Sequence, residues 1–243
     1  MKTLFNCSLI FLSMVMIHSA VLAQTSESGK GTITTQTRNL GDYSGIALNV
    51  PATLSVSQSS KFSFRMEGRQ ELLDQVITEV KNSELVIKFR DNKWKGSGES
   101  TLRIFIELPA ISGLEINGSG DIAALTDITT KNLGLVVNGS GDITMKKIIA
   151  TTITAEINGS GSILNIAGNA DNVTFAVNGS GDINADNLQS KKVSASATGS
   201  GDIAAGAAET LDINIAGSGD IFYKGNPASV NKNIVGSGNV SQR

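Results

Sequence analysis

The sequence predicts an all-β fold: a right-handed parallel β-solenoid (β-helix) with about 20 residues per coil, preceded by irregular N-terminal strands. Three observations predict it. The motif Gly-Ser-Gly-Asp-Ile or a close variant occurs seven times, successive motifs lie 18 to 21 residues apart, and an alternating apolar run precedes each motif. The motifs begin at Gly118, Gly139, Gly159, Gly179, Gly199, Gly217 and Gly236.

Each coil is expected to carry two strands. Apolar residues stand two, four and six positions before the first glycine, as Ile157, Ala155 and Ile153 do in one coil. This period of two indicates a half-buried strand. A second apolar row, four positions after that glycine, starts a short strand on another wall: Ile122, Ile143, Ile163, Ile183, Ile203, Ile221 and Val240.

Stacking of these coils would build the core. Identical positions in successive coils lie about 4.8 Å apart, so the aliphatic rows become aligned columns. Burying one isoleucine contributes about 1.5–3 kcal/mol, and chain entropy offsets most of the sum. One coil is therefore unstable alone, while a stack is stable. Parallel crossovers within one sheet are almost always right-handed, which predicts the hand of the solenoid.

Residues 24–109 lack the motif and are predicted to form irregular first coils, or a cap, of the solenoid that residues 110–243 continue. Alternating apolar residues predict strands over 46–50, 53–56, 62–66 and 102–108, and residues 71–74 suggest one helical turn. A polar turn between 76–80 and 85–89 predicts a hairpin. Pro51 predicts a sheet edge or a bulge, because proline has no N–H for the ladder.

The first 23 residues read as a secretory signal peptide. Lys2 supplies the positive end, an apolar stretch runs over residues 4–17, and small residues lead to a cut after Ala23. The apolar stretch is too short for a transmembrane span, although a retained membrane anchor is the alternative. We therefore expect an exported protein, either periplasmic or secreted to the cell surface.

Export would leave a mature chain without thiol or imidazole chemistry. Cys7 and His18, the single residues of their types, both lie in the predicted signal. The mature chain then has no disulfide, no thiolate nucleophile, no imidazole base and no Cys/His zinc site. Removing Lys2 leaves 19 basic against 22 acidic residues, without a basic stripe, so nucleic acid is not an expected partner.

The glycines of the motif are predicted to shape a tight corner, because glycine reaches positive φ without steric cost. The predicted structural glycines are Gly118, Gly120, Gly139, Gly141, Gly159, Gly161, Gly179, Gly181, Gly199, Gly201, Gly217 and Gly219. Asparagine precedes four of the motifs, at Asn117, Asn138, Asn158 and Asn178. Stacked asparagines can hydrogen-bond from coil to coil as a ladder.

The motif also repeats a carboxylate. The row consists of Asp121, Asp142, Asp182, Asp202 and Asp220, with Ser162 and Asn239 interrupting it. Like charges about 4.8 Å apart repel by about 1 kcal/mol in water, so something must compensate them. Bonds to backbone amides, which would make the aspartates turn caps, are the favoured interpretation. Calcium along the row is the weaker alternative, and no cofactor is predicted.

A single tryptophan marks the polar loop over residues 91–99. Trp94 lies between Lys93 and Lys95, which suggests a ligand-contacting loop. The alternative, which we favour, is that the ring packs back on the N-terminal strands.

The recurrent Asn-Gly-Ser-Gly-Asp-Ile resembles the head GIN domain family, whose members are labelled putative auto-transporter adhesins. The likeness includes the strand sequence Leu85-Val86-Ile87-Lys88 and the run over residues 113–122, which contains the first motif. The resemblance covers most of the mature chain and implies a secreted β-solenoid. The word adhesin is a label by analogy and assigns no functional residue here.

Three functions remain open at this level. The favoured one is a non-enzymatic adhesin or binding module of the cell envelope or surface, with a glycan, a matrix component or an envelope protein as ligand. An assembly scaffold is the alternative, since solenoid ends expose strand edges that must be capped or paired with another copy. A carbohydrate-active enzyme is less favoured, because the carboxylates are themselves the repeat rather than a singular group.

Overall fold

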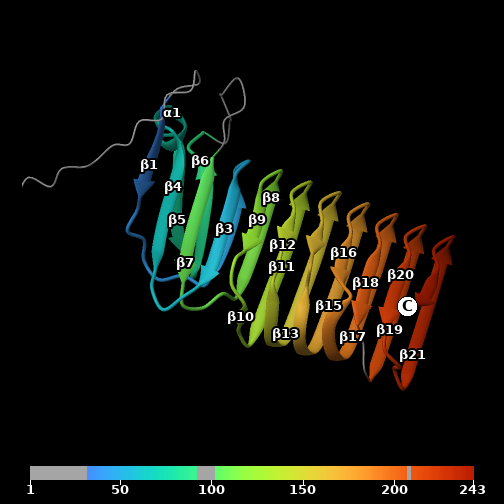
Figure 1. The fold of residues 1–243 in the computed structure, drawn as a ribbon. Helices are drawn as coiled ribbons and strands as arrows, with labels where there is room; N and C mark the ends of the chain where they lie inside the picture. The colour runs from blue at the N-terminus through green and yellow to red at the C-terminus, as the bar shows by residue number, and fades with distance from the viewer. Residues whose placement is uncertain (1–31, 92–101, 207–208) are drawn as a thin grey trace, which may run out of the picture.

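The computed structural model describes residues 32–91, 102–206 and 209–243, and these residues form a β-solenoid. Of the described residues, 67% are in strands and 2% in helix, and the solenoid has about 6 turns of about 20 residues each. Two long sheets face each other across a single core and run the length of the molecule (Figure 1). The predicted solenoid and its repeat length are confirmed, while its hand stays a prediction.

The first sheet, called sheet A, contains the strands that follow the corners. Its order is β1 (Ile33–Thr37), β4 (Ser63–Arg69), β7 (Arg103–Leu108), β3 (Thr53–Gln58), β9 (Asp121–Ala124), β12 (Ile143–Thr144), β14 (Ile163–Leu164), β16 (Ile183–Ala185), β18 (Ile203–Gly206), β20 (Ile221–Lys224) and β22 (Val240–Gln242).

The second sheet, called sheet B, contains the strands that precede the corners. Its order is β21 (Ser229–Gly236), β19 (Thr210–Gly217), β17 (Asn187–Gly199), β15 (Ala167–Gly179), β13 (Lys147–Gly159), β11 (Asn132–Gly139), β8 (Gly113–Gly118), β2 (Gly45–Asn49), β6 (Glu84–Phe89) and β5 (Val76–Lys81). The short strand β10 (Ile128–Thr129) also pairs with β13.

Parallel pairing in strict register turns the apolar rows into columns. Leu135, Ala155, Phe175, Ala195 and Ile213 are successive partners on sheet B, and all are at most 2% exposed. The large Phe175 ring lies between two alanines, so the column fills its space without overpacking. The period-two prediction is confirmed, because the same rows form the core.

The N-terminal region extends the same two sheets. Strand β2 pairs in parallel with β8, and β3 with β9, so residues 45–54 make a coil whose corner is Val50-Pro51-Ala52 instead of the motif. Pro51 thus lies at a corner between the sheets, neither at a sheet edge nor in a bulge. The predicted hairpin is present as antiparallel β5 and β6, with positive φ at Asn82 and Ser83.

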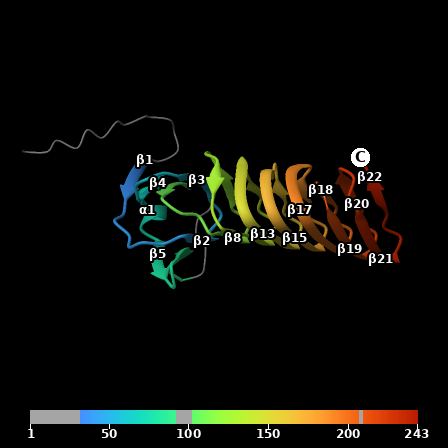
Figure 2. The same ribbon diagram turned by 90° about the horizontal axis from the view of Figure 1, so that it is seen from below.

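Antiparallel strands and one helical turn close the N-terminal end (Figure 2). Helix α1 (Gln70–Leu73) buries Leu72 and Leu73 against the core. The Arg38 guanidinium ties this cap together, since it donates to the carbonyls of Leu73 and Val76 at 3.4 and 2.8 Å. Burial lowers the pKa of Arg38 from its ordinary value.

Among the described residues, no helix or antiparallel strand covers the C-terminal end of the stack. Strands β21 and β22 are the last of their sheets, and the side chains of β21 are largely exposed. Lys232 stands where the apolar column continues from Ile213, and its ammonium nitrogen lies 5.8 Å from the centre of the Tyr223 ring. A charged residue in an inward position is a feature that discourages another strand from adding to an edge.

Candidate functional site

From Gly139 on, both glycines of each corner are required for close stacking of the coils, and the first is also required for its backbone conformation. The first has φ between +119° and +145° in every motif, a region that L-residues avoid. The second does not have positive φ, which corrects the sequence-based expectation for that row. A Cβ on Gly161 would lie 2.0 Å from the carbonyl oxygen of Gly141, so the second glycine is needed for close stacking of the coils.

An asparagine ladder lines the corners as predicted. The side-chain amides of Asn138, Asn158 and Asn178 each donate at 2.9 Å to the preceding asparagine. Asn117 donates to Asn49 at 2.8 Å, so the ladder extends into the coil that lacks the motif. Sequence reasoning missed Asn49, because 68 residues separate it from the next rung.

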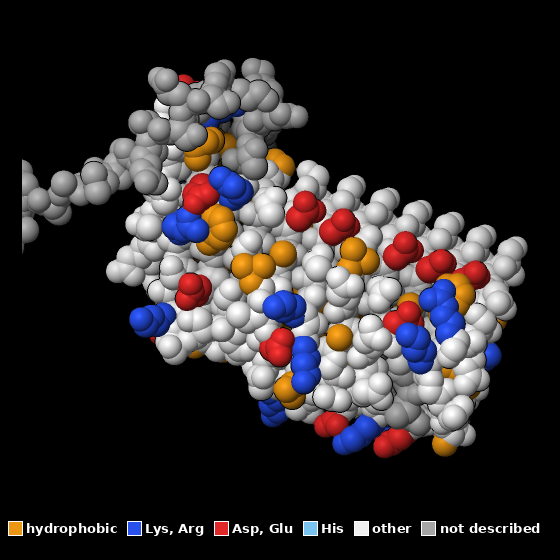
Figure 3. Space-filling view, viewed as in Figure 1, with side chains coloured by type: hydrophobic (Ala, Val, Ile, Leu, Met, Phe, Trp, Pro, Cys, Tyr) orange, Lys and Arg blue, Asp and Glu red, His pale blue; other side chains and the backbone are white. Residues whose placement is uncertain are grey.

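The aspartates cap the next coil. Oδ1 of Asp182 accepts the backbone N–H of Asp202 at 2.9 Å, and Asp202 does the same for Asp220 at 2.7 Å. Asp121, Asp142 and Asp220 bond in the same way to the residues that follow them in the row. These bonds favour the turn-capping interpretation, and Figure 3 shows the acidic side chains along one edge of the array.

Two candidate sites stay without a structural test. Within the residues that the structure describes, no group of three or more His, Cys, Asp and Glu side chains could hold a metal ion. Calcium binding along the aspartate row stays a prediction. Trp94 lies outside the described residues, as does the predicted signal peptide.

The outer face of sheet A carries a row of side chains that we call the axial column, and the strand registers align it in two parts. The first part is Phe105, Ser55, Ala123, Thr144 and Leu164, and the second is Asn184, Ala204 and Phe222. The two parts adjoin where Ile163 pairs with Ile183, one residue before Leu164 and Asn184. Seven strand spacings of about 4.8 Å make the column about 34 Å long. Small and medium side chains form its middle, where Ala204 is buried, and an aromatic ring stands near each end, with Arg65 paired to Phe105 and Ser241 paired to Phe222.

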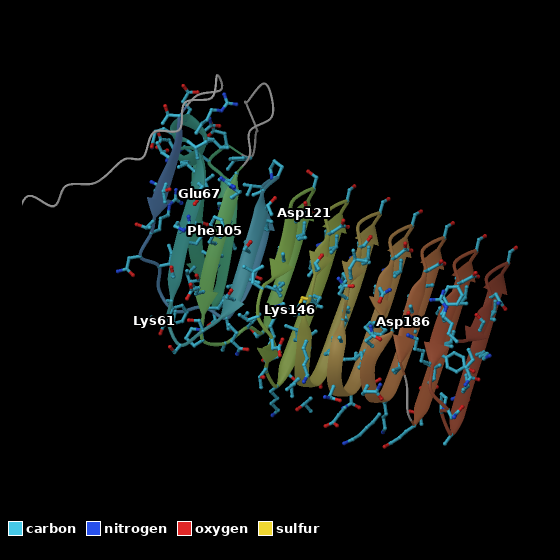
Figure 4. The ribbon with its side chains drawn as sticks, viewed as in Figure 1. Lys61, Glu67, Phe105, Asp121, Lys146 and Asp186 are labelled. Atoms are coloured by element: carbon cyan, nitrogen blue, oxygen red, sulfur yellow. The ribbon has the colours of Figure 1, made fainter. Side chains whose placement is uncertain are left out.

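Both aromatic rings lie under a guanidinium group. Arg65 lies 3.9 Å from the centre of the Phe105 ring, and Arg243 lies 3.6 Å from that of Phe222. Glu67 forms ion pairs with Arg65 and, at 3.2 Å, with Arg103. Glu67, Phe105, Asp121 and Asp186 all appear on the face that Figure 4 shows. The column thus has a charged and aromatic group at each end.

The C-terminal group contains a carboxylate that lacks full hydrogen bonding. Gly206 and Lys224 are strand partners, Asp186 follows Ala185, which pairs with Ala205, and Arg243 follows Gln242, which pairs with Tyr223. Lys224 Nζ and Arg243 Nη1 lie 3.5 and 3.7 Å from Asp186 Oδ2. Asp186 Oδ1 is buried and has no hydrogen-bond partner among the described residues.

Sequence reasoning missed both of these rows, although the spacing contains them. The axial column of the repeats is the fifth position after the first glycine, and Asp186 is in the seventh. A bulky Phe222 stands in a column that holds Ala204, Asn184 and Thr144 in earlier coils. An aromatic residue in a row of smaller ones was the available signal.

Comparison with known proteins gives a family and several similar folds. The family described as "Putative auto-transporter adhesin, head GIN domain" matches residues 42–227. No protein with a curated description matches the chain. Within the described residues, no helix is long and apolar enough to cross a membrane.

Solved structures share the fold over most of their length. A putative adhesin from Bacteroides fragilis is 25% identical, with a TM-score of 0.82 over 89% of this chain and 98% of that one. A putative adhesin from Parabacteroides distasonis is 26% identical, with a TM-score of 0.72 over 88% and 98%. A protein named putative lipid binding protein, from the same species, is 26% identical, with a TM-score of 0.71 over 87% and 96%.

Proposed function

We propose a binding function from one premise: the chain belongs to the head GIN domain family, whose match over residues 42–227 spans more than half of it. The protein is a non-enzymatic adhesin-type binding module, exported to the cell envelope or surface. Its ligand is an extended molecule, a glycan, a matrix component or an envelope protein, that lies along the solenoid.

The axial column is the observation that carries this proposal. Positions on one face of sheet A present side chains from successive strands, between Phe105 and Phe222. A rigid row of this kind offers the same contact to each unit of a repeating ligand. Each contact is weak, and their sum along one ligand raises the affinity, as in any multivalent interaction.

Binding to immobilised ligands tests the proposal. The chain without its predicted signal, residues 24–243, would be passed over polysaccharides and extracellular-matrix proteins, with calcium and with a chelator. We expect saturable retention on at least one ligand, and reduced retention of a Phe105→Ala, Phe222→Ala double variant. A matched variant on the outer face of sheet B, Thr174→Ala, should bind as the parent does.

Two outcomes of this binding experiment would contradict the proposal. If the folded chain binds none of the polysaccharides and none of the matrix proteins, the adhesin proposal is wrong for these ligand classes. If the double variant and the Thr174→Ala variant bind equally well, binding exists but the axial column does not carry it.

A second candidate function, an assembly scaffold, is favoured by the open C-terminal end. Ile234 and Val235 of the last coil are 41% and 67% exposed, next to unpaired strand edges. The Parabacteroides distasonis structure named putative lipid binding protein suggests an apolar ligand as a further alternative. Phospholipid vesicles in the binding panel would test it. Sedimentation at increasing concentration would reveal a scaffold by reversible self-association.

A further inference from the structure

We propose that the C-terminal end of the solenoid is a docking surface for a β-strand of another protein, and that this strand places a carboxylate opposite Lys232. Strands β21 and β22 are the last of sheet B and sheet A, so each has one edge that no described strand pairs (Figure 2). This surface lies at the end of the stack, whereas the axial column lies along its side. The inference therefore goes beyond the proposed adhesin function and is tested separately from it.

The side chains of β21 are accessible to a partner. Lys232 is exposed, and Ile234 and Val235 are 41% and 67% exposed. One coil earlier, Ile213 and Ile215 in the columns of Lys232 and Ile234 are only 2% exposed, because β21 covers them. A strand added to β21 would bury Ile234 in the same way, and burial of apolar surface favours its addition.

The backbone of β21 offers a partner its main-chain hydrogen bonds. The strand spans the eight residues Ser229–Gly236 and pairs with β19 on one side only. In strand addition, the free N–H and C=O groups of such an edge provide affinity, and alternate side chains provide specificity. The specificity of this edge therefore depends on the side chains of β21 that point inward.

Lys232 determines which strand can be added. It lies in the apolar column between the inward residues Val230 and Ile234, and its ammonium group is 5.8 Å from the centre of the Tyr223 ring. An added strand would bury this ammonium group, which is strongly destabilising without a counter-charge. A carboxylate opposite Lys232 supplies that charge. The matching strand thus has the pattern apolar, any residue, acidic, any residue, apolar.

The charge of the last coil favours the same partner. Residues 221–243 contain three cationic side chains and no Asp or Glu. Two of the three pair with Asp186, which leaves Lys232 without a carboxylate partner among the described residues. Asn239 also stands where the preceding corner has Asp220. An acidic strand would therefore be attracted to this coil and would meet no carboxylate side chain in it.

A second copy of this chain does not supply the required carboxylate. Its N-terminal edge in sheet B is β5, whose inward residues are Val76, Thr78 and Val80, because their partners on β6 are buried. The Arg38 guanidinium donates to Thr78 Oγ1 at 3.0 Å and to the Val76 carbonyl at 2.8 Å. Head-to-tail contact would thus bring a second cation near Lys232, and contact between two C-terminal ends would bring two Lys232 side chains together. The charges select against self-association and for a different partner.

The test uses residues 24–243 and synthetic peptides that copy one coil of the chain, residues 209–226. In a coil added to β21, residue 213 of the peptide would lie opposite Lys232. We expect the Ile213→Glu peptide to bind about tenfold more tightly than the unsubstituted peptide, which corresponds to about 1.4 kcal/mol. The Ile213→Lys peptide should bind more weakly than either. Fluorescence anisotropy of labelled peptides would measure the affinities, and hydrogen exchange should show new protection of amides in β21 and β22.

Two controls separate the position of the charge from its sign. The Asn214→Glu peptide has the same net charge as the Ile213→Glu peptide, but its new carboxylate would lie on the outer face of sheet B, so it should bind as the unsubstituted peptide does. The Lys232→Glu protein should reverse the order and prefer the Ile213→Lys peptide. Circular dichroism and the melting temperature would establish that this variant is folded.

Three results would overturn the proposal. If no peptide binds at millimolar concentration, the C-terminal end does not accept a strand. If the Ile213→Glu and Asn214→Glu peptides bind equally well, or if β21 and β22 gain no protection, a strand opposite Lys232 is not what binds. If the parent chain associates with itself and no peptide competes, the occupant is a second copy. Retention on polysaccharides and matrix proteins, which tests the adhesin function, is independent of all three.

Discussion

At the scale of single residues, the glycines of the corners have the least freedom. From Gly139 on, a Cβ at either glycine of a corner would lie within 2.3 Å of a carbonyl oxygen of the preceding coil, and the first glycine has positive φ as well. Gly161 has the Gly141 oxygen 2.0 Å and a Val137 methyl carbon 2.9 Å from where its Cβ would be. Neither neighbour is free to move, because one is backbone and the other is in the core.

We expect the Gly161→Ala substitution to lower the free energy of unfolding by about 3 kcal/mol, since overpacking against backbone forces the coils apart. Urea denaturation followed by circular dichroism would measure it. Gly41→Ala is the matched control, because nothing lies within 4 Å of a Cβ at that glycine. Equal stability of the two variants would contradict the close stacking described for the corners.

A second residue-scale prediction concerns the aspartate row. Asp182→Ala removes the acceptor of the Asp202 amide and should cost about 1 kcal/mol. Asp182→Asn keeps an oxygen acceptor and removes one of the stacked charges, so its stability should equal or exceed that of the parent. Chemical denaturation of both variants checks this order.

The same two variants address the calcium alternative. If the aspartates act as turn caps, the melting temperature of the parent should not change between a chelator and millimolar calcium. A rise with calcium that Asp182→Asn abolishes would make the row a metal site, because a ligand bound to the folded state raises its stability.

At the scale of elements, the N-terminal cap contains a group that reports on its own packing. Tyr43 is 4% exposed and packs against Phe62 with ring centres 5.5 Å apart. Burial raises the pKa of the Tyr43 hydroxyl to about 12, above its unfolded value of about 10. The folded state therefore holds more protons than the unfolded state between these pH values.

The resulting stabilisation is fully present below about pH 10 and is lost as the pH rises through about 12. We expect the urea midpoint of the parent to fall more steeply over this range than that of Tyr43→Phe, which has no hydroxyl to ionise. Every other ionisable group is the same in both proteins, so the difference between the two curves is the measurement. Parallel curves would show that the hydroxyl is solvated.

Much of the element structure could be predicted from the sequence, and particular strands show why. The motif spacing and the alternation before Gly159 predict β13 and its neighbours, because each coil repeats one physical solution. The coil that β2 and β3 form could not be aligned with these repeats from the sequence. Its corner is Val50-Pro51-Ala52, and 68 residues separate Asn49 from Asn117, so neither motif nor period connects the two rungs.

The candidate site was less accessible to sequence reasoning for a related reason. Counting from each first glycine places Phe222 and Asp186 in their columns. Counting does not show that Arg243 reaches back to Asp186 from three coils away, since that depends on side-chain length and on the small residue between them. Trp94, which the sequence did single out, belongs to the part that the structure leaves undescribed.

At the scale of the whole molecule, the two ends of the solenoid differ. Antiparallel strands and α1 cover the N-terminal end, while the C-terminal edges are open and carry Lys232 in a core column. Edge strands with an inward charge resist the addition of another strand. The charge thus favours a molecule whose stack ends at β21 and β22.

We expect Lys232→Ile to promote association, because it completes the apolar column at the open end. Analytical ultracentrifugation should show dimers or larger species at concentrations where the parent is monomeric. Lys192→Ile, which places the same side chain on the outer face of sheet B, controls for general adhesiveness. A monomeric Lys232→Ile protein would show that other features of β21 protect the edge.

The in-register corners make this molecule a ruler. Every coil adds one rung of about 4.8 Å to every column at once, without changing the rungs already in place. A gene that gains or loses one repeat of about 20 residues would therefore change the length of the axial column by one strand spacing, about 4.8 Å. Reach along a ligand could then be adjusted in whole steps, while the chemistry at the two ends of the column stays the same.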